Sequence, residues 1–203
     1  MRYGILADVH GKSEALQKAL RLLQDVDRIV FLGDVPGYRD IEGMPECLQA
    51  LAAEGALAVR GNCDAYMLAH RRPPEIAAPL WDYYTAWPEE ILEGDLLFVH
   101  GGPRDPLHER VNEEERAWRN FRARQFAICF HGHEHRVTAF ASRDDGDVET
   151  VKLPETGLCT LEANRRYIIG VGSVGKPKDE CRGSVVLFDA ETRMLRVERF
   201  TID

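Results

Sequence analysis

Five short apolar runs in this sequence each end at side chains that are able to hold a metal ion. The side chains that follow the runs are Asp8, His10, Asp34, Asn62, Asp64, His100, His133 and His135. Each run is rich in Val, Ile, Leu and Phe and is bounded by glycine, which is typical of a fully buried β-strand. Because ligand sites in an open α/β sheet lie beyond the carboxyl ends of its strands, we expect these side chains to form one site.

The elements that must position these side chains are the apolar runs and the helices between them. We expect strands at residues 2–7, 28–32, 56–60, 96–99 and 126–130. Helices are expected at 13–23, where Ser13 caps an amphipathic segment, and at 44–54, where leucines recur at helical spacing. Two βαβ units follow from this order, with parallel strands joined by right-handed crossovers.

The later part of the sequence changes character twice. Residues 65–90 have a helical, proline-interrupted pattern without strand character, and a further helix is expected after Asn112 as its cap. After His135, strands are expected at 137–141, 148–153, 167–171, 184–188 and 194–200. Strands that follow one another without helices predict antiparallel hairpins and a second sheet. The expected architecture is two sheets packed face to face with helices outside.

Each candidate side chain also has a structural interpretation. Asp34 could stabilise a turn, Asp64 could cap a helix, and His100 could be a hydrogen-bonded core histidine. His133 and His135 are more specific, because they lie two residues apart around a glycine that lets the backbone approach a ligand closely. Each structural interpretation is reasonable alone, but together they would place metal-binding side chains at consecutive strand ends by chance. A shared metal site is therefore the better interpretation.

Composition and charge narrow the classes of protein to which this chain can belong. With 203 residues, 44% hydrophobic and 30% charged, the chain is expected to form a single globular domain spanning 1–203. The apolar runs are far shorter than the ~20 residues of a membrane span, and no signal core precedes the first strand, so a cytoplasmic location is expected. Five widely spaced cysteines predict reduced thiols. The net charge of −8 argues against stable nucleic-acid binding.

The order of the motifs resembles the calcineurin-like metallophosphoesterase superfamily. The matching motifs are Asp-x-His, Gly-Asp, Gly-Asn-x-Asp, His-Gly and Gly-His-x-His, which together cover nearly the whole chain. The YfcE-like phosphodiesterase branch is closest in character, since Gly-Asn-Cys-Asp also occurs there and residues 100–107 and 172–178 look like that branch. The resemblance implies an α/β fold, a four-layer αββα sandwich of two mixed β-sheets flanked by helices.

The resemblance also implies two divalent metal ions. One ion would be held by Asp8, His10, Asp34 and His135, and the other by Asp34, Asn62, His100 and His133. Asp34 would therefore bridge the two. Mixed imidazole and carboxylate ligands suit Mn, Fe, Ni, Co or Zn more than Ca or Mg, and Mn is the favoured ion.

Such a metal pair predicts the chemistry. A bridging water loses its proton near neutral pH, and the hydroxide attacks phosphorus while the ions neutralise the non-bridging oxygens. We expect a dinuclear metal-dependent hydrolase of a small phosphorylated substrate, nucleotides included, with phosphodiesters favoured. The alternatives are a nucleotide or protein phosphatase, a dinucleoside polyphosphate hydrolase, or a scaffold protein that has lost the metals. Association into a homo-oligomer is left open.

Four residues are expected to take part in catalysis: Asn62, Cys63, Asp64 and Arg104. Many members of the superfamily have, in place of Cys63, a histidine that can protonate the leaving alkoxide. A thiol is a weak hydrogen-bond donor, so we expect leaving groups that need little help, such as phenolates, nucleotides or pyrophosphates. His131 is an alternative proton donor, although its position on a strand favours packing. Arg104 would steady a substrate phosphate or form a surface ion pair.

One aromatic segment has two interpretations. Trp81, Tyr83, Tyr84 and Trp87 could stack a nucleobase, but aromatic residues at helical spacing more often pack a helix onto the body of the protein. We therefore expect these four side chains to be part of the core.

Overall fold

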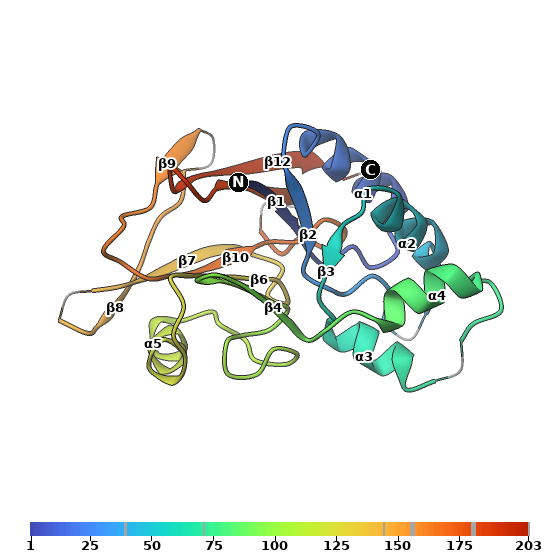
Figure 1. Cartoon of the computed structure of the whole chain (residues 1–203), viewed down its shortest axis with the longest axis horizontal. Coiled ribbons are helices and arrows are strands. Elements are labelled where there is room, and N and C mark those ends of the chain that lie inside the picture. Colours follow the sequence, from blue (N-terminus) through green and yellow to red (C-terminus); the bar gives the residue numbers. More distant parts are fainter. Residues whose placement is uncertain (39, 71, 144, 155–156, 180–181, 203) are drawn as a thin grey trace.

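Two six-stranded β-sheets pack face to face, with helices on their outer sides (Figure 1). The computed structural model describes residues 1–38, 40–70, 72–143, 145–154, 157–179 and 182–202. Both sheets are mixed, since each contains parallel and antiparallel pairs. The predicted αββα sandwich is therefore confirmed.

The first sheet contains the N-terminal strands and has the order β3-β2-β1-β11-β12-β9. Its strands are β1 (Arg2–Leu6), β2 (Arg28–Phe31), β3 (Leu57–Ala58), β9 (Leu158–Thr160), β11 (Arg182–Asp189) and β12 (Met194–Thr201). Helices α1 (Ser13–Leu22) and α2 (Met44–Ala53) connect the first three strands, which pair in parallel as predicted. The remaining pairs in this sheet are antiparallel.

The second sheet has the order β4-β5-β6-β10-β7-β8. Its strands are β4 (Glu90–Glu93), β5 (Leu96–Val99), β6 (Ile128–His131), β7 (Val137–Ser142), β8 (Val148–Thr150) and β10 (Tyr167–Val171). Strands β5, β6 and β10 run parallel, and α5 (Glu114–Ala123) connects β5 to β6. Two further helices, α3 (Asn62–Leu68) and α4 (Ala78–Thr85), lie between β3 and β4 in the chain.

Side-chain alternation divides the core into layers. Tyr3, Ile5 and Ala7 point between the sheets, whereas Leu6 packs beneath α1 and α2. The inter-sheet layer is continuous, since the Phe130 ring lies 5.3 Å from the ring of Phe188 in the opposite sheet. Helix α1 buries Ala15, Leu16, Ala19 and Leu20, one face of an amphipathic helix.

Several expectations about the elements were wrong. The strands after His135 do not form a sheet of their own: β7, β8 and β10 join one sheet, and β9, β11 and β12 join the other. The open edge of β1 is completed by β11, and the open edge of β6 by β10. Strands β4 and β9 were not predicted; both are short and half-exposed, so alternation is weak in their sequences.

Two of the predicted helix starts were displaced by one residue, whereas α2 begins at Met44 as predicted. Helix α1 begins at Ser13 itself, and its N-cap residue is Lys12, which makes no side-chain cap. The N-cap of α5 is Glu113, because the Asn112 side chain points instead to the Oε2 atom of Glu134, 3.4 Å away. Neither displacement changes which strands the helices connect.

The aromatic segment at residues 81–87, which spans the end of α4 and the turn after it, packs as expected. Tyr84 is fully buried, Trp87 is 4% exposed, and both belong to the cluster beneath the helices of the first sheet. Trp81 and Tyr83 pack against the same cluster. Across the parts of the chain described, no helix has the length and apolar character needed to cross a membrane.

Candidate metal centre

The predicted ligands come together where strands of both sheets end. Asp8 and His10 follow β1, Asp34 follows β2, His100 follows β5, and Asn62 is the first residue of α3. His133 and His135 follow β6. The site is therefore built from both sheets, and the sandwich must be assembled before it exists.

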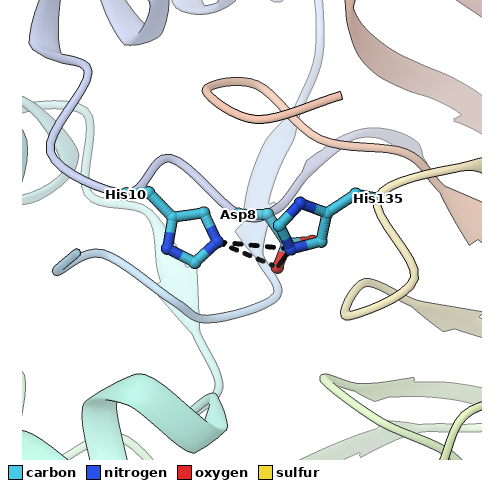
Figure 2. A group of neighbouring side chains, drawn as sticks. All are labelled: Asp8, His10 and His135. Carbon is cyan, nitrogen blue, oxygen red and sulfur yellow. Dashed lines mark hydrogen bonds and ion pairs between the residues drawn. The ribbon is translucent and has the colours of Figure 1, made fainter. Parts of the chain in front are cut away.

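Asp8, His10 and His135 form the first ligand group (Figure 2). The Oδ1 atom of Asp8 lies 3.2 Å from Nε2 of His135 and 3.8 Å from Nε2 of His10. The two Nε2 atoms are 3.3 Å apart. Asp8 is fully buried, and its Oδ1 has no hydrogen-bond partner of acceptable geometry among the described residues. An orphaned carboxylate oxygen facing two imidazole nitrogens fits a cation.

The ring orientation of three histidines strengthens this fit. Nδ1 of His10 lies 3.0 Å from the carbonyl oxygen of Pro36. The corresponding distances are 2.8 Å from His100 to the carbonyl of Leu32, and 2.6 Å from His135 to the carbonyl of Lys176. A carbonyl oxygen only accepts, so Nδ1 carries the hydrogen and each Nε2 turns a lone pair to the site. Lone pairs that converge in this way repel one another unless a cation lies between them.

Asn62, His100 and His133, the candidates for a second ligand group, lie together with Nε2 of His100 at the middle. That atom lies 3.0 Å from Oδ1 of Asn62 and 3.2 Å from Nδ1 of His133. His100 is fully buried at the end of β5, so its lone pair is directed by its hydrogen bond to Leu32 and not by solvent. The donor set here is imidazole nitrogen and an amide oxygen, in place of the carboxylate oxygen of the first group, and imidazole suits a transition-metal ion.

Asp34 lies between the two groups. Its Oδ2 is 3.6 Å from Nε2 of His100 and 3.9 Å from Nε2 of His10, one histidine from each group. Its Oδ1 accepts a 2.8 Å hydrogen bond from the backbone N–H of Cys63. One oxygen is thus anchored by the protein and the other faces both ligand groups.

The backbone at the site is held in a conformation that L-residues rarely adopt. Five of the ligand residues have positive φ: Asp8 (57°), His10 (48°), Asp34 (64°), His133 (62°) and His135 (58°). Among the non-glycine residues described, Arg193 is the one other example. Such conformations each cost on the order of 1 kcal/mol and persist where the surrounding fold imposes them. Their concentration here marks a preorganised site.

Electrostatics keep Asp8 ionised. Burial raises the pKa of this carboxyl group, but the adjacent histidines more than offset burial and hold the pKa at about 2. In the opposite direction, burial and the neighbouring His100 lower the pKa of His133 to about 4. A carboxylate and a neutral imidazole are the forms that bind metal ions.

Two glycines allow the close packing of these groups. A Cβ atom at Gly61 would lie 2.2 Å from Oδ1 of Asp34, and one at Gly132 would lie 2.9 Å from Oδ2 of Asp8. The same Asp8 oxygen accepts a 3.0 Å hydrogen bond from the backbone N–H of His133. The sequence-based expectation that the backbone at Gly132 makes a close approach agrees with this geometry.

Cys63 lies beside the ligands. Its Sγ is within 4.8 Å of the ligand atoms of His10 and Asp34, and it accepts a 3.6 Å hydrogen bond from the amide of Asn62. Burial, followed by the charge of Asp34, raises the pKa of the Cys63 thiol. The thiol therefore keeps its proton and faces the site as a weak acid.

Asp64 is fully buried and binds backbone. Its carboxylate accepts hydrogen bonds from the N–H groups of Gly61 (2.7 Å), Asp34 (2.7 Å) and Val35 (3.1 Å), and from the hydroxyl of Tyr84 (3.1 Å). It does cap a helix, although α3 begins at Asn62 and not at Ala65. These contacts tie the start of α3 to the turn after β2. A direct catalytic role for Asp64 stays a prediction.

Arg104 has contacts outside the two ligand groups. Its side chain is 44% exposed and forms an ion pair with Glu109, Nη1 to Oε1 3.6 Å. Its backbone N–H donates to Asn120 on α5. His131, the alternative proton donor, is fully buried, and burial lowers its pKa to about 4. The sequence-based roles of Arg104 and His131 in catalysis stay predictions.

Sequence reasoning missed Arg110. Its guanidinium lies 3.5 Å from Oε1 of Glu134, the residue between His133 and His135, and its charge lowers the pKa of His133. The backbone carbonyl of Arg110 accepts a hydrogen bond from Arg116 on α5. Nothing in the local sequence distinguishes Arg110 from Arg104, because both lie on the loop after His100.

Comparison of the sequence with known proteins identifies a family and a relative. The family model described as the calcineurin-like phosphoesterase superfamily domain matches residues 1–193. An uncharacterized protein of Methanocaldococcus jannaschii is 25% identical, with the match covering 98% of this chain and 87% of that protein.

Solved phosphoesterase structures are also similar to this chain. The crystal structure of a metallophosphoesterase from Sphaerobacter thermophilus is 28% identical, with a TM-score of 0.86 and coverage of 100% of this chain and 90% of that chain. The E. coli phosphoesterase YfcE shares the fold, with a TM-score of 0.50 and 22% identity over all of both chains. Because this family model matches residues 1–193, the chain belongs to the calcineurin-like phosphoesterase superfamily of metal-dependent hydrolases.

Proposed function

We propose that this protein is a dinuclear metal-dependent phosphodiesterase. The observation that carries the proposal is the position of Asp34, whose free oxygen faces one histidine of each ligand group at 3.6 and 3.9 Å. Asp8, His10, Asp34 and His135 would hold one ion, and Asp34, Asn62, His100 and His133 the other. When bound, a pair of such ions lowers the pKa of water toward ~7 and neutralises charge on phosphoryl oxygens.

The chain's own residues prepare the site for that chemistry. The carbonyls of Pro36, Leu32 and Lys176 hold three imidazoles with Nε2 directed inward, so little reorganisation is needed. Asp8 and Asp34 balance positive charge, and the Cys63 thiol keeps a proton close to the ligand atoms. No serine or cysteine paired with a base is required, because the nucleophile is not a side chain.

The preference for a diester rests on the charge at the edge of the site. Arg110 is the cation beside His133, and Glu134 is its partner at 3.5 Å, so the pair adds no net positive charge. A phosphodiester carries a single negative charge in the reacting group, whereas a monoester carries nearly two at neutral pH. Two divalent ions, two carboxylates and the hydroxide nucleophile would together leave about one positive charge, which balances the singly charged diester without a further cation.

The experiment compares bis(p-nitrophenyl) phosphate with p-nitrophenyl phosphate. Protein freed of metal by chelation and checked by elemental analysis should be inactive, and Mn should restore hydrolysis with higher kcat/KM for the diester. Asp34→Asn should lose bound metal, and Asp82→Asn, an exposed aspartate on α4, serves as the matched control. Full activity of metal-free protein would overturn the mechanism, and a higher kcat/KM for the monoester would make the protein a phosphatase.

A further inference from the structure

Glu134 is a buried carboxylate that the proposed ligand sets do not use. It lies between two of the candidate histidine ligands, and the residue is 5% exposed. The other carboxylates buried among the described residues already have partners, since Asp8 and Asp34 face the ligand groups and Asp64 binds backbone N–H groups. A charge removed from water is costly unless it is paired, so Glu134 requires a partner.

A loop anchored on α5 supplies two groups that face Glu134. Nη1 of Arg110 lies 3.5 Å from Oε1, and the amide of Asn112 donates a 3.4 Å hydrogen bond to Oε2. Val111, between these two residues, is fully buried in the cluster that α5 shares with the second sheet. The backbone carbonyl of Arg110 also accepts a hydrogen bond from Arg116 on α5. The loop is therefore held where both side chains reach the same carboxylate.

The contact between Arg110 and Glu134 is an ion pair and not a hydrogen bond. Oε1 of Glu134 has no hydrogen-bond partner among the described residues, and the Arg110 side chain is 48% exposed. Glu134 therefore offsets the charge of Arg110 without enclosing its guanidinium group. Because the carboxylate is nearly buried, solvent and salt screen its charge weakly.

The charge of Arg110 reaches the candidate metal centre. Burial and the charge of His100 lower the pKa of His133, and Arg110 contributes in the same direction. A charge that acts on the His133 imidazole also acts on a phosphoryl group held by an ion at the same imidazole. With Glu134 in place, the ion pair presents little net charge to that group. Without Glu134, the guanidinium would present a full positive charge.

We propose that Glu134 determines the choice between diesters and monoesters, because it neutralises Arg110 beside the second ligand group. The inference rests on the proposed function, since the phosphoryl group must bind at the metal centre. A monoester carries nearly two negative charges at neutral pH and a diester carries one, so an unneutralised Arg110 favours the monoester more strongly. Glu134 acts through Arg110 and is a positioning residue.

The test measures the ratio of kcat/KM for p-nitrophenyl phosphate to kcat/KM for bis(p-nitrophenyl) phosphate. Glu134→Gln keeps the shape of the side chain and an acceptor for Asn112 but removes the charge. In Mn-loaded protein this variant should raise the ratio about tenfold, mainly by lowering KM for the monoester, as expected for one charge interaction near a protein surface. Arg110→Gln should lower the ratio by a similar factor. The double variant should return to the parent ratio, because the ion pair that it replaces has no net charge.

Opposite shifts in the two single variants separate a charge effect from a structural one. If Glu134 only held the loop in place, both single variants would reduce kcat for both substrates, and this result would overturn the inference. A double variant with the raised ratio of Glu134→Gln would also overturn it, since Glu134 would then act without Arg110. Glu115→Gln, which removes a carboxylate paired with Arg119 on α5, is the matched control and should leave the ratio unchanged.

Failure of the proposed function has a different signature. A parent protein that prefers the monoester would refute the diester assignment, and the shifts in the variants would still decide the role of Glu134. If neither ester is hydrolysed, calorimetry with inorganic phosphate and metal-loaded protein replaces turnover. Glu134→Gln should then bind phosphate about tenfold more tightly than the parent protein, and equal affinities would overturn the inference.

Discussion

At the scale of single residues, the site is organised by atoms that lack a conventional hydrogen-bond partner. Oδ1 of Asp8 is buried without one, and Oδ2 of Asp34 faces two histidine nitrogens that point their lone pairs toward it. A cation accepts several lone pairs at once, so one ion in each group would satisfy these acceptors together. This arrangement makes the individual candidate ligands unequal.

Asp34 should be the ligand whose loss is most damaging. Removal of a carboxylate from between the two groups leaves both ions under-neutralised, whereas removal of Asn62 affects one. Asp34→Ala should therefore lose more metal than Asn62→Ala and should reduce kcat by more than about 100-fold, beyond the effect typical of residues that only orient ligands. Elemental analysis and diester turnover on both variants check this. Two bound metals and near-normal turnover in Asp34→Ala would contradict the bridging assignment.

Cys63 should make the reaction sensitive to the leaving group. A buried thiol is a weak donor, so the departing oxygen must carry most of its charge unaided, and the rate should depend steeply on leaving-group pKa. Cys63→His should flatten that dependence, since general acid catalysis typically contributes about 10²–10⁴-fold. The measurement is a series of substituted phenyl phosphodiesters, with Cys159→His on β9 as the control. A shallow dependence in the parent protein would mean that another side chain already protonates the leaving group.

The sequence and the structure favour different arginines as the group that contacts the substrate phosphate: the sequence favours Arg104 and the structure favours Arg110. Arg110 lies beside His133, whereas Arg104 contacts Glu109, so Arg110→Gln should raise KM for a phosphodiester about tenfold with little change in kcat. A hydrogen bond to a charged group contributes roughly 1.5 kcal/mol, which corresponds to that factor. Arg104→Gln should have the smaller effect, and Arg119→Gln on α5 is the neutral control. A larger rise in KM for Arg104→Gln would restore the sequence-based choice.

At the scale of elements, the turn after β2 and the start of α3 act as one unit. The carboxylate of Asp64 binds backbone N–H groups from both segments, and a Cβ at Gly61 would collide with Asp34. The ligands Asp34 and Asn62 are therefore positioned by the same buried group. This makes Asp64 a structural organiser of the second ligand group.

Asp64→Ala should destabilise the protein even without metal. The change leaves three backbone N–H groups and the Tyr84 hydroxyl without their acceptor, and each unsatisfied buried group costs about 1–3 kcal/mol. We expect the free energy of unfolding in urea to fall by about 3 kcal/mol or more, against about 1 kcal/mol for Tyr84→Phe. Unchanged stability with lost activity would instead favour a catalytic role for Asp64.

At the scale of the whole molecule, the two ends of the chain meet in one sheet. β1 pairs with β11, and all six strands of the second sheet lie between these two in the chain, so the first sheet is not made from a continuous segment. The layer between the sheets is shared, and the candidate metal centre draws residues from the strand ends of both. The expectation of a single domain over residues 1–203 stays a prediction, and this topology supports it.

The two sheets should therefore unfold together, in a single transition. Trp81 and Trp87 report on the first sheet, and Trp118 reports on α5 outside the second. In Trp118→Phe, and separately in Trp81→Phe/Trp87→Phe, the thermal transition followed by fluorescence should coincide with that followed by circular dichroism of the same variant. Separate midpoints within one variant would show that the sheets unfold independently.

The sequence by itself determined the class of fold and the candidate ligands that the fold brings together. Asp8, His10, Asp34, His100 and the histidines after β6 could be named because buried strands are short apolar runs, and their carboxyl ends are visible as the next polar residue. The parallel order of β1, β2 and β3 followed from the intervening helices. These are local patterns, so no information about distant contacts was needed.

Only the tertiary structure decided how distant segments combine. Sheet membership of β7 to β12 depends on which open edge each strand completes, and the sequence of a strand does not encode its neighbour. The orientation of each imidazole depends on a carbonyl from another segment, as with His100 and Leu32. The same is true of Arg110 beside His133, because side chains far apart in sequence affect one another only when the fold brings them together.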